Sequence, residues 1–471
     1  MRRHLLPAIL AVLCLSSAVA AVRVGPGGGG GGPATAAAAL VPAPAEAPVL
    51  TPRRVPNLLA QPVGTARLVQ ALDDLAASTP DSACLVVTEG PLVLYDRQGD
   101  QPLVPASGMK LLTATAVLAR LDPEERLRTS VVASRAPVGG VVEGDLWLVG
   151  GGDPVLGTAP WAADFIRQPA LFTPLEELAD RVVAAGVSEV RGRIVGDESR
   201  YDQVRYVESW PPRYAADNEI GPMSALAVND GFAAWDPADV AFDDPATGAA
   251  GVLTGLMRER GVVVLGEAGA GPAPDGASTL ADIESPPVAE LVTSMLRESD
   301  NGTAELLVKE LGLREGGSGS TATGRAVVAE TLASLGLPTE GLTVVDGSGL
   351  DPANQVSCQL LHDLLEASDD GGPVDRGLAV AGSSGTLARR FLDTPVIGAL
   401  RGKTGSLRGV ASLSGFVDSQ GGTELVFASI FNGIDRFDDG VPLQDMLGAA
   451  LVRYPDLPAL SEIGPEGYGP G

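Results

Sequence analysis

The sequence is poor in the residues that hydrolases most often use for acid–base chemistry. Of its 471 residues, two are histidines and three are cysteines. Only His362 lies beyond the N-terminal apolar segment, and we interpret it as a histidine on the surface of a helix. A Ser-His-Asp triad is therefore disfavoured, and a zinc site of the usual histidine and cysteine ligands cannot be assembled. We expect neither a metal nor a cofactor.

Lysine is also scarce, because Lys110, Lys309 and Lys403 are the only three among 33 lysines and arginines. GC-rich coding could replace lysine by arginine throughout, so the scarcity alone decides nothing. Only lysine, however, can lose its proton when buried and act as a base. Lys110 and Lys403 stand in short motifs beside a serine or a threonine, whereas Lys309 has no such neighbour. We interpret Lys309 as a helix-surface residue.

The chain lacks the positive charge of a nucleic-acid-binding protein. Its formal net charge is −26 and its isoelectric point is about 4.4. Contacts to a phosphate backbone depend on lysine and arginine. Nucleic acid is therefore excluded as a partner.

The N-terminus has the pattern of an export signal. Two arginines precede an apolar run from Leu5 to Val22 that contains Ala18-Val19-Ala20. Residues 1–22 are either a cleaved signal peptide or a retained membrane anchor. Residues 23–61 are rich in Gly, Pro and Ala and are predicted to be an unstructured linker. In the oxidising compartment that export implies, Cys84 and Cys358 could form a disulfide or remain two buried thiols.

The rest of the chain alternates predicted helices and strands. A helix over Ala66–Ala77, strands over Ala83–Val87 and Leu92–Asp96, and a helix from Ser107 to about Leu121 indicate an α/β sandwich. Helices resume at Val288, and two apolar strands, 410–417 and 424–431, follow near the end. We expect residues 62–125 and 286–454 to form one catalytic domain and residues 126–285 to form a mixed α/β insertion. Residues 455–471 are expected to be a disordered tail.

Ser107-Gly108-Met109-Lys110 opens an apolar helix. Residues three apart share one helix face, so the lysine amine can reach the serine hydroxyl. A neutral Lys110 could then take the proton of Ser107 and make it a nucleophile without histidine. The alternative is a helix-capping serine beside a surface lysine.

Two further motifs carry polar groups suited to a peptide substrate. Ser299-Asp300-Asn301 lies in a predicted loop between two helices, where it can direct a hydroxyl and an amide at a cleft or simply cap a helix. Lys403-Thr404-Gly405-Ser406 is predicted to start a strand over 407–417. Its lysine and threonine could hold a carboxylate, and its glycine would let a substrate backbone approach the strand closely. A solvated strand start is the alternative.

Together the three motifs resemble one family. Ser-x-x-Lys, Ser-Asp-Asn and Lys-Thr-Gly, in this order, are the signature of penicillin-binding proteins and class A β-lactamases. Lys110 and Asn301 are 191 positions apart, a separation similar to that in penicillin-binding protein 4 type D-alanyl-D-alanine carboxypeptidase/endopeptidases. Further matches include Gly151-Gly152-Asp153-Pro154, Ala304-Glu305-Leu306 and Asp346-Gly347-Ser348-Gly349-Leu350. The resemblance covers roughly residues 65–450.

The resemblance implies a β-lactamase/transpeptidase-like antiparallel sheet flanked by helices and a role for each motif residue. Ser107 would attack the bond between two D-alanines with Lys110 as its base, giving an acyl-serine that water hydrolyses. Ser299 would relay a proton and Asn301 would bind the substrate amide. Lys403 and Thr404 would hold the terminal carboxylate, beside Gly405. The backbone N–H groups of Ser107 and Ser406 would form the oxyanion hole.

The expected partners are peptidoglycan stem peptides and β-lactams, and the expected location is the cell envelope, with any membrane contact through the N-terminal segment. Asp197 matches an aspartate that in relatives binds the free amine of a diaminopimelyl side chain, with a structural turn as its alternative. A serine β-lactamase is a second reading, although the sequence has no Glu-x-x-Leu-Asn element to position a deacylating water. An inactive wall-binding scaffold on the same fold is a third.

Overall fold

The computed structural model describes residues 55–165, 168–236, 238–435 and 437–457. The predicted signal or anchor over 1–22 lies outside these residues, as do most of the linker and residues 458–471 of the tail. Helix α2 (Val55–Ala77) begins inside the segment 23–61 that composition predicted to be unstructured, so that prediction is wrong for residues 55–61. No helix in the described part of the chain has the length and apolar character needed to cross a membrane.

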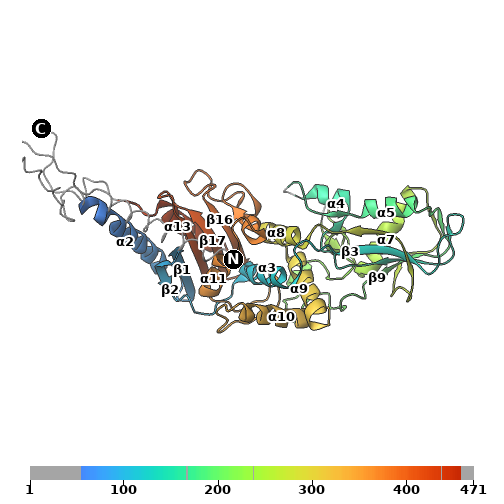
Figure 1. The fold of residues 1–471 in the computed structure, drawn as a ribbon, viewed down its shortest axis with the longest axis horizontal. Coiled ribbons are helices and arrows are strands. Elements are labelled where there is room, and N and C mark those ends of the chain that lie inside the picture. The colour runs from blue at the N-terminus through green and yellow to red at the C-terminus, as the bar shows by residue number, and fades with distance from the viewer. Residues whose placement is uncertain (1–54, 166–167, 237, 436, 458–471) are drawn as a thin grey trace, which may run out of the picture. The chain divides into compact units, whose positions relative to one another are not determined.

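A six-stranded antiparallel sheet forms the centre of the catalytic part (Figure 1). Its strand order is β15 (Ala379–Val380), β16 (Leu400–Leu407), β17 (Val410–Asp418), β18 (Glu424–Asn432), β1 (Ala83–Glu89) and β2 (Leu92–Arg97). Alternate residues point to opposite faces of a strand, and here both faces are buried. On β1, Cys84 and Val86 join one apolar cluster, whereas Leu85 and Val87 join another. Strand β1 is therefore buried along nearly its whole length.

Helices cover both faces of this sheet, which gives the predicted antiparallel sheet flanked by helices. One face packs against α3 (Met109–Arg120), α8 (Val288–Glu298), α9 (Asn301–Gly316), α10 (Thr321–Ser334) and α11 (Cys358–Glu366). The other face packs against α2 and α13 (Phe437–Arg453). Three short helical turns complete this part: η1 (Ala106–Gly108), α12 (Pro373–Gly377) and η3 (Gly385–Leu387).

A disulfide joins Cys84 of β1 to Cys358 at the start of α11. The two cysteines are 274 positions apart and both are fully buried. The bond ties the sheet to one of the helices that cover it. Near it, His362 of α11 is only 2% exposed, and its Nε2 lies 2.8 Å from Thr88 Oγ1. The prediction of a helix-surface histidine is wrong, because this side of α11 packs against β1.

Residues 128–284 build separate sheets around their own core. The five-stranded sheet has the order β13 (Gly269–Ala270), β9 (Ile194–Asp197), β5 (Leu146–Val149), β3 (Arg128–Ala133) and β14 (Ser278–Glu284). A three-stranded parallel sheet has the order β12 (Val263–Val264), β8 (Glu189–Val190) and β4 (Val141–Val142). Two small pairs are β6 (Leu156–Gly157) with β7 (Thr173–Pro174), and β10 (Phe232–Ala234) with β11 (Val240–Ala241).

The helices of this region are α4 (Ala159–Asp164), α5 (Leu175–Ala184), α6 (Arg213–Ala216), η2 (Asn229–Gly231) and α7 (Pro245–Glu259). Helices α5 and α7 share one apolar cluster with the five-stranded sheet. The separate sheets and this separate core support the proposal that residues 126–285 are an insertion in the catalytic domain.

Residues 198–223 of the insertion, which we name the return segment, pack on the catalytic part. Lys309 of α9 is fully buried and forms an ion pair with Asp202 of this segment. Its Nζ also donates to the carbonyl of Val204 at 3.1 Å. The prediction that Lys309 lies on a helix surface is therefore wrong. Its neighbour Glu310 pairs with Arg200 of the same segment at 2.5 Å.

Candidate active site

Ser107 and Lys110 lie at the junction of η1 and α3, with Lys110 Nζ 3.0 Å from Ser107 Oγ. The motif crosses from a 3₁₀ turn into the first turn of the helix, and both side chains lie on the same side, as the spacing predicted. Ser107 is partly exposed, whereas Lys110 is fully buried. Ala106, just before the serine, has a φ of 48°. Such backbone strain in a non-glycine residue is concentrated at functional sites.

Two further acceptors surround the amine of Lys110. Its Nζ donates to Asn301 Oδ1 at 2.7 Å and to the carbonyl oxygen of Ser348 at 2.7 Å. Burial lowers the pKa of Lys110 to about 8, against the opposing effect of Asp300, Asp346 and Glu305. Desolvation disfavours the charged ammonium, and the nearby carboxylates favour it. A substantial fraction of Lys110 is therefore neutral near pH 8, which a general base requires.

Ser299, Asp300 and Asn301 occupy the boundary between α8 and α9. Ser299 ends α8 in the left-handed conformation, with a φ of 62°. Asp300 caps α9 by accepting the backbone N–H of Thr303, so the capping interpretation holds for this residue. The side chains of its neighbours, Ser299 and Asn301, point toward the other two motifs. Asn301 reaches Lys110, and Ser299 accepts a hydrogen bond from Lys403 Nζ at 2.8 Å.

Lys403, Thr404, Gly405 and Ser406 lie within β16, one strand earlier than predicted. The run after the motif is interrupted between Leu407 and Val410, where β16 turns into β17. A Cβ on Gly405 would lie 2.6 Å from the carbonyl oxygen of Pro105 and 3.0 Å from the nitrogen of Gly108. Only glycine lets β16 approach the Ser107 turn so closely. The third motif is thereby held beside the first.

Lys403 is buried, with a side chain directed at the second motif. Its Nζ donates to Ser299 Oγ and to the carbonyl of Thr404, both at 2.8 Å. Burial, with a smaller effect of Lys110, holds the pKa of Lys403 well below its ordinary value. A bound carboxylate would favour the charged form again. Thr404 Oγ1 donates to Thr386 Oγ1 at 2.7 Å, a contact that sequence reasoning missed.

Sequence reasoning also missed two buried carboxyl groups beneath Lys110. Glu305 on α9 and Asp346 in the loop between α10 and α11 are both fully buried. Burial raises the pKa of Glu305 to about 8, with a further contribution from Asp346. Burial also raises the pKa of Asp346, although its hydrogen bonds oppose the change. Their place in the family-like segments around 305 and 346 was the only signal in the sequence.

Asp197 lies at the end of β9 and is only 5% exposed. Its two carboxylate oxygens accept backbone N–H groups, from Ser199 at 2.8 Å and from Ala273 at 2.8 Å. These bonds give Asp197 a structural role in the insertion. Its contact with a substrate amine stays a prediction.

A cavity of about 130 Å³ lies beside Asn301, between α9 and the insertion. Its lining includes the carboxyl groups of Asp230 and Asp300 and the backbone around Glu219, whose carbonyl accepts Asn301 Nδ2 at 2.8 Å. Burial, and secondarily the charge of Asp300, raises the pKa of Asp230 well above its ordinary value. The cavity is therefore acidic and adjoins the second motif.

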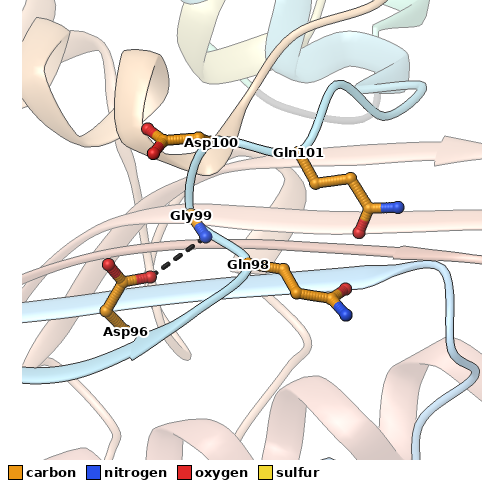
Figure 2. Close-up of a pocket in the computed structure, with 5 residues that line it drawn as sticks. All are labelled: Asp96, Gln98, Gly99, Asp100 and Gln101. Carbon is orange, nitrogen blue, oxygen red and sulfur yellow. Dashed lines mark hydrogen bonds between the residues drawn. The ribbon is translucent and has the colours of Figure 1, made fainter.

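A larger surface hollow, of about 520 Å³, lies away from these residues (Figure 2). It is lined by Asp96 near the end of β2 and by residues 98–101 of the turn that follows, where Gly99 N donates to Asp96 Oδ1 at 3.0 Å. None of the residues that line this hollow belongs to the three motifs, whereas Asp300 and Asn301 of the second motif line the smaller cavity. We therefore place the active site at the motifs.

Comparisons with known proteins identify the family of this chain. The model of the D-Ala-D-Ala carboxypeptidase 3 (S13) family matches residues 68–236 and 233–447. This chain belongs to that family. It is also 32% identical to the D-alanyl-D-alanine carboxypeptidase of Actinomadura sp. (strain R39), over 83% of this chain and 86% of that protein. It is 32% identical to carboxypeptidase DacB of Mycolicibacterium smegmatis, over 81% of this chain and 83% of that protein.

A solved structure supports the S13 fold. Penicillin binding protein 4 (dacB) from Haemophilus influenzae superimposes with a TM-score of 0.69 at 20% identity, covering 81% of this chain and 99% of that one. The family, the fold class and the D-Ala-D-Ala carboxypeptidase type of enzyme predicted from the three motifs are confirmed. The S13 assignment favours neither a β-lactamase nor an inactive scaffold.

Proposed function

We propose that this S13 protein cleaves the D-alanyl-D-alanine bond of peptidoglycan stem peptides through an acyl-serine at Ser107. One observation carries the assignment of roles: a buried amine, Lys110 Nζ, lies 3.0 Å from the partly exposed hydroxyl of Ser107. A nucleophile needs a base within hydrogen-bond reach, and burial has adjusted the pKa of this amine to about 8.

The reaction begins when Ser107 Oγ bonds to the carbonyl carbon of the penultimate D-alanine and its proton passes to Lys110. The N–H groups of Ser107 and Ser406 stabilise the oxyanion. The C–N bond then breaks, and the leaving amine of the terminal D-alanine takes up a proton relayed by Ser299. Water finally adds to the acyl-serine ester and releases the shortened peptide.

Lys403 and Thr404 hold the carboxylate of the terminal D-alanine. Lys403 becomes fully charged when the carboxylate arrives, since an opposite charge stabilises the ammonium. The Thr404 hydroxyl exchanges its bond to Thr386 for one to the substrate. A β-lactam carries a carboxylate in the corresponding place, and we propose that it acylates Ser107 and leaves slowly. One relative structure was solved with a β-lactam bound, the Haemophilus influenzae penicillin binding protein 4.

The acidic cavity beside Asn301 is our proposed place for a free amine on the substrate side chain. Asp230 and Asp300 line it, and neither forms an ion pair with a residue in the described ranges. An ammonium group placed between two carboxylates would relieve their repulsion. This role is more compatible with the geometry than the predicted one for Asp197, whose oxygens already accept two backbone N–H groups.

We also propose that the protein is exported and acts in the cell envelope, where its substrate lies. The disulfide between Cys84 and Cys358 fits an oxidising compartment. Residues 1–22 would provide the export signal or an anchor.

The test is to incubate the purified protein with a diaminopimelate pentapeptide and measure free D-alanine. Wild-type protein should release D-alanine, and Ser107→Ala should release none. A cross-linked dimer substrate in a parallel reaction tests for endopeptidase activity. Rapid turnover of penicillin without release of D-alanine would instead favour the β-lactamase, and no reaction with either substrate would favour the scaffold.

A further inference from the structure

We propose that the turn Asp346–Gly349, fixed by Glu305 and Asp346 and reached from the insertion by Trp210, aims the lone pair of Lys110 at Ser107. This inference rests on the proposed role of Lys110 as the general base. It makes Glu305, Asp346 and Trp210 positioning residues rather than catalytic ones.

The first step concerns the geometry of a neutral amine. Neutral Nζ carries two hydrogens and one lone pair. Two acceptors at 2.7 Å, Asn301 Oδ1 and the Ser348 carbonyl, can take both hydrogens. The lone pair then faces the remaining neighbour, Ser107 Oγ, at 3.0 Å. Displacing either acceptor would leave the amine free to rotate, and its lone pair would no longer be held toward Ser107 Oγ.

The second step concerns the peptide group that supplies the Ser348 carbonyl. The same peptide group carries the N–H of Gly349, which donates to Asp346 Oδ1 at 2.8 Å. One planar unit is therefore held at both ends, by Asp346 and by Lys110. The hydrogen bond from Gly349 N–H to the Asp346 carboxylate also polarises the Ser348 carbonyl, because hydrogen bonds in a chain strengthen one another.

The preceding peptide group is held in the same way. The N–H of Ser348 donates to Glu305 Oε1 at 2.7 Å, and the carbonyl of Gly347 accepts the Thr113 hydroxyl at 2.7 Å. Glu305 Oε1 also accepts the N–H of Gly347 at 2.9 Å. Its other oxygen, Oε2, is buried without a hydrogen-bond partner among the described residues. Burying Glu305 with one oxygen unpaired costs free energy. We infer that the cost is tolerated because Glu305 fixes the position of the turn.

Gly349 shows how tightly the turn fits against the nucleophile. Its φ is +85°, and a Cβ would lie 1.9 Å from the carbonyl oxygen of Ala106. The turn thus packs directly on the residue that precedes Ser107. Glycine is required both for the left-handed backbone and for this approach.

The third step is the contact from the insertion. Trp210 Nε1 donates to Asp346 Oδ2 at 2.8 Å, and the Tyr214 hydroxyl donates to the carbonyl of Leu350 at 2.9 Å. Both side chains come from the return segment and are buried in one cluster with Leu350. The return segment also touches the other acceptor of Lys110, since the carbonyl of Glu219 receives Asn301 Nδ2. The insertion therefore supports both groups that orient the base.

The test measures the rate constant of acylation by a fluorescent penicillin from pH 6 to pH 10 in full-length variants. Trp210→Phe keeps the apolar ring and removes the N–H, and Trp147→Phe in β5 is its control. We expect the limiting acylation rate constant of Trp210→Phe to fall about tenfold, as for loss of one charge-assisted hydrogen bond. Affinity in the initial complex should stay unchanged. A purely structural role would lower the fraction of protein that reacts and leave the rate constant of that fraction at the wild-type value.

Glu305→Gln is the second variant, with exposed Glu315→Gln on the same helix as control. The titratable groups near Lys110 are Glu305, Asp346, Asp300 and Lys403, and Glu305, whose pKa is about 8, becomes charged over the same pH range as Lys110 becomes neutral. Removing an acid that favours the ammonium should move the midpoint of the rate–pH profile to lower pH. Gln can still accept both N–H groups through its oxygen, so the limiting rate constant should change less than in Trp210→Phe.

Wild-type rate constants and pH midpoints in both variants would overturn the inference. Failure of the proposed function looks different. In that case the wild-type rate would not rise through pH 8, and Lys110→Arg would still be labelled.

Discussion

Lys110 and Asn301 stand 191 positions apart in the sequence, yet Lys110 Nζ donates to Asn301 Oδ1 at 2.7 Å. The whole insertion lies between them in the chain. Its return segment comes back to this contact, because the carbonyl of Glu219 receives the other end of the same amide. The first two motifs are thus in direct contact, and a hydrogen bond from Asn301 to the insertion holds the amide that makes this contact.

Lys110→Arg should reduce acylation of Ser107 by at least about 100-fold, since a guanidinium cannot act as a base and general-base catalysis contributes roughly this factor or more. Lys403→Arg keeps the positive charge near the substrate carboxylate and should mainly raise the KM. Both variants can be measured with fluorescent penicillin and with a pentapeptide substrate. Labelling of Lys110→Arg at the wild-type rate would refute the assignment of the base.

Acylation should accelerate with rising pH, with its midpoint near pH 8, and reach a plateau at higher pH. The pKa of Lys110 in the folded protein is about 8, below its ordinary value, because the amine is buried. Below that pH the amine is mostly protonated, so the rate should fall as protons bind. The unfolded chain keeps its lysine proton to higher pH, so this group adds stability as the pH rises above about 8. A rate that falls as the pH rises from 6 to 8 would contradict the account.

Lys309→Ala should lower the free energy of unfolding by about 3 kcal/mol, because it leaves Asp202 without its partner and empties a buried site. The matched control is Arg191→Ala, which removes exposed ion pairs with Glu143 and Glu189 and should destabilise the protein far less, because solvent screens exposed pairs. Denaturant unfolding with constant m-values measures both. Equal small effects would mean that the contact between α9 and the return segment is not a stabilising one.

The double variant Cys84→Ser, Cys358→Ser should lose about 2–5 kcal/mol of stability, the range for removal of a native disulfide. Acylation by penicillin should be retained in the protein that remains folded, because neither cysteine belongs to the three motifs. Thermal unfolding with and without reductant, compared between wild type and the variant, checks this. A wild-type melting temperature that is insensitive to complete reduction would show that the bond contributes no stability.

Asp230→Asn should weaken binding of a pentapeptide with a free side-chain amine. We expect the KM to rise about tenfold, as for loss of one partly buried charge contact, with a smaller effect on kcat. A peptide in which that amine is acetylated serves as the control substrate and should not distinguish the variant from wild type. Asp197→Asn tests the earlier assignment in the same assay. A larger effect at Asp197 than at Asp230 would restore it.

The local part of the site could be predicted from the sequence. Ser107 and Lys110 are three residues apart on one short stretch, so their contact follows from helix geometry. The position of Lys403 beside Ser299 could not be derived from spacing, because it depends on how β16 packs against the end of α8. Only the family resemblance indicated that Lys403 and Ser299 belong to one site.

The errors at Lys309 and His362 have a common physical cause. Lys309 looks like a surface residue because its own helix offers no partner, and its partner Asp202 comes from the return segment, 107 positions earlier. His362 was placed on a surface for the same reason, because the strand that covers it lies 274 positions away at Thr88. The segment Asp346–Leu350 was singled out only as a match to the family. Its contact with Lys110 was not predictable, because backbone carbonyls carry no sequence signal.

The central claim is that Ser107 is the nucleophile, and one measurement tests it most directly. The protein is incubated with penicillin, digested, and mapped by mass spectrometry beside Ser107→Ala. We predict one covalent adduct, on the peptide that contains Ser107, and none in the variant. An adduct on the peptide containing Ser299 or Ser348, or an adduct that persists in Ser107→Ala, would contradict the account.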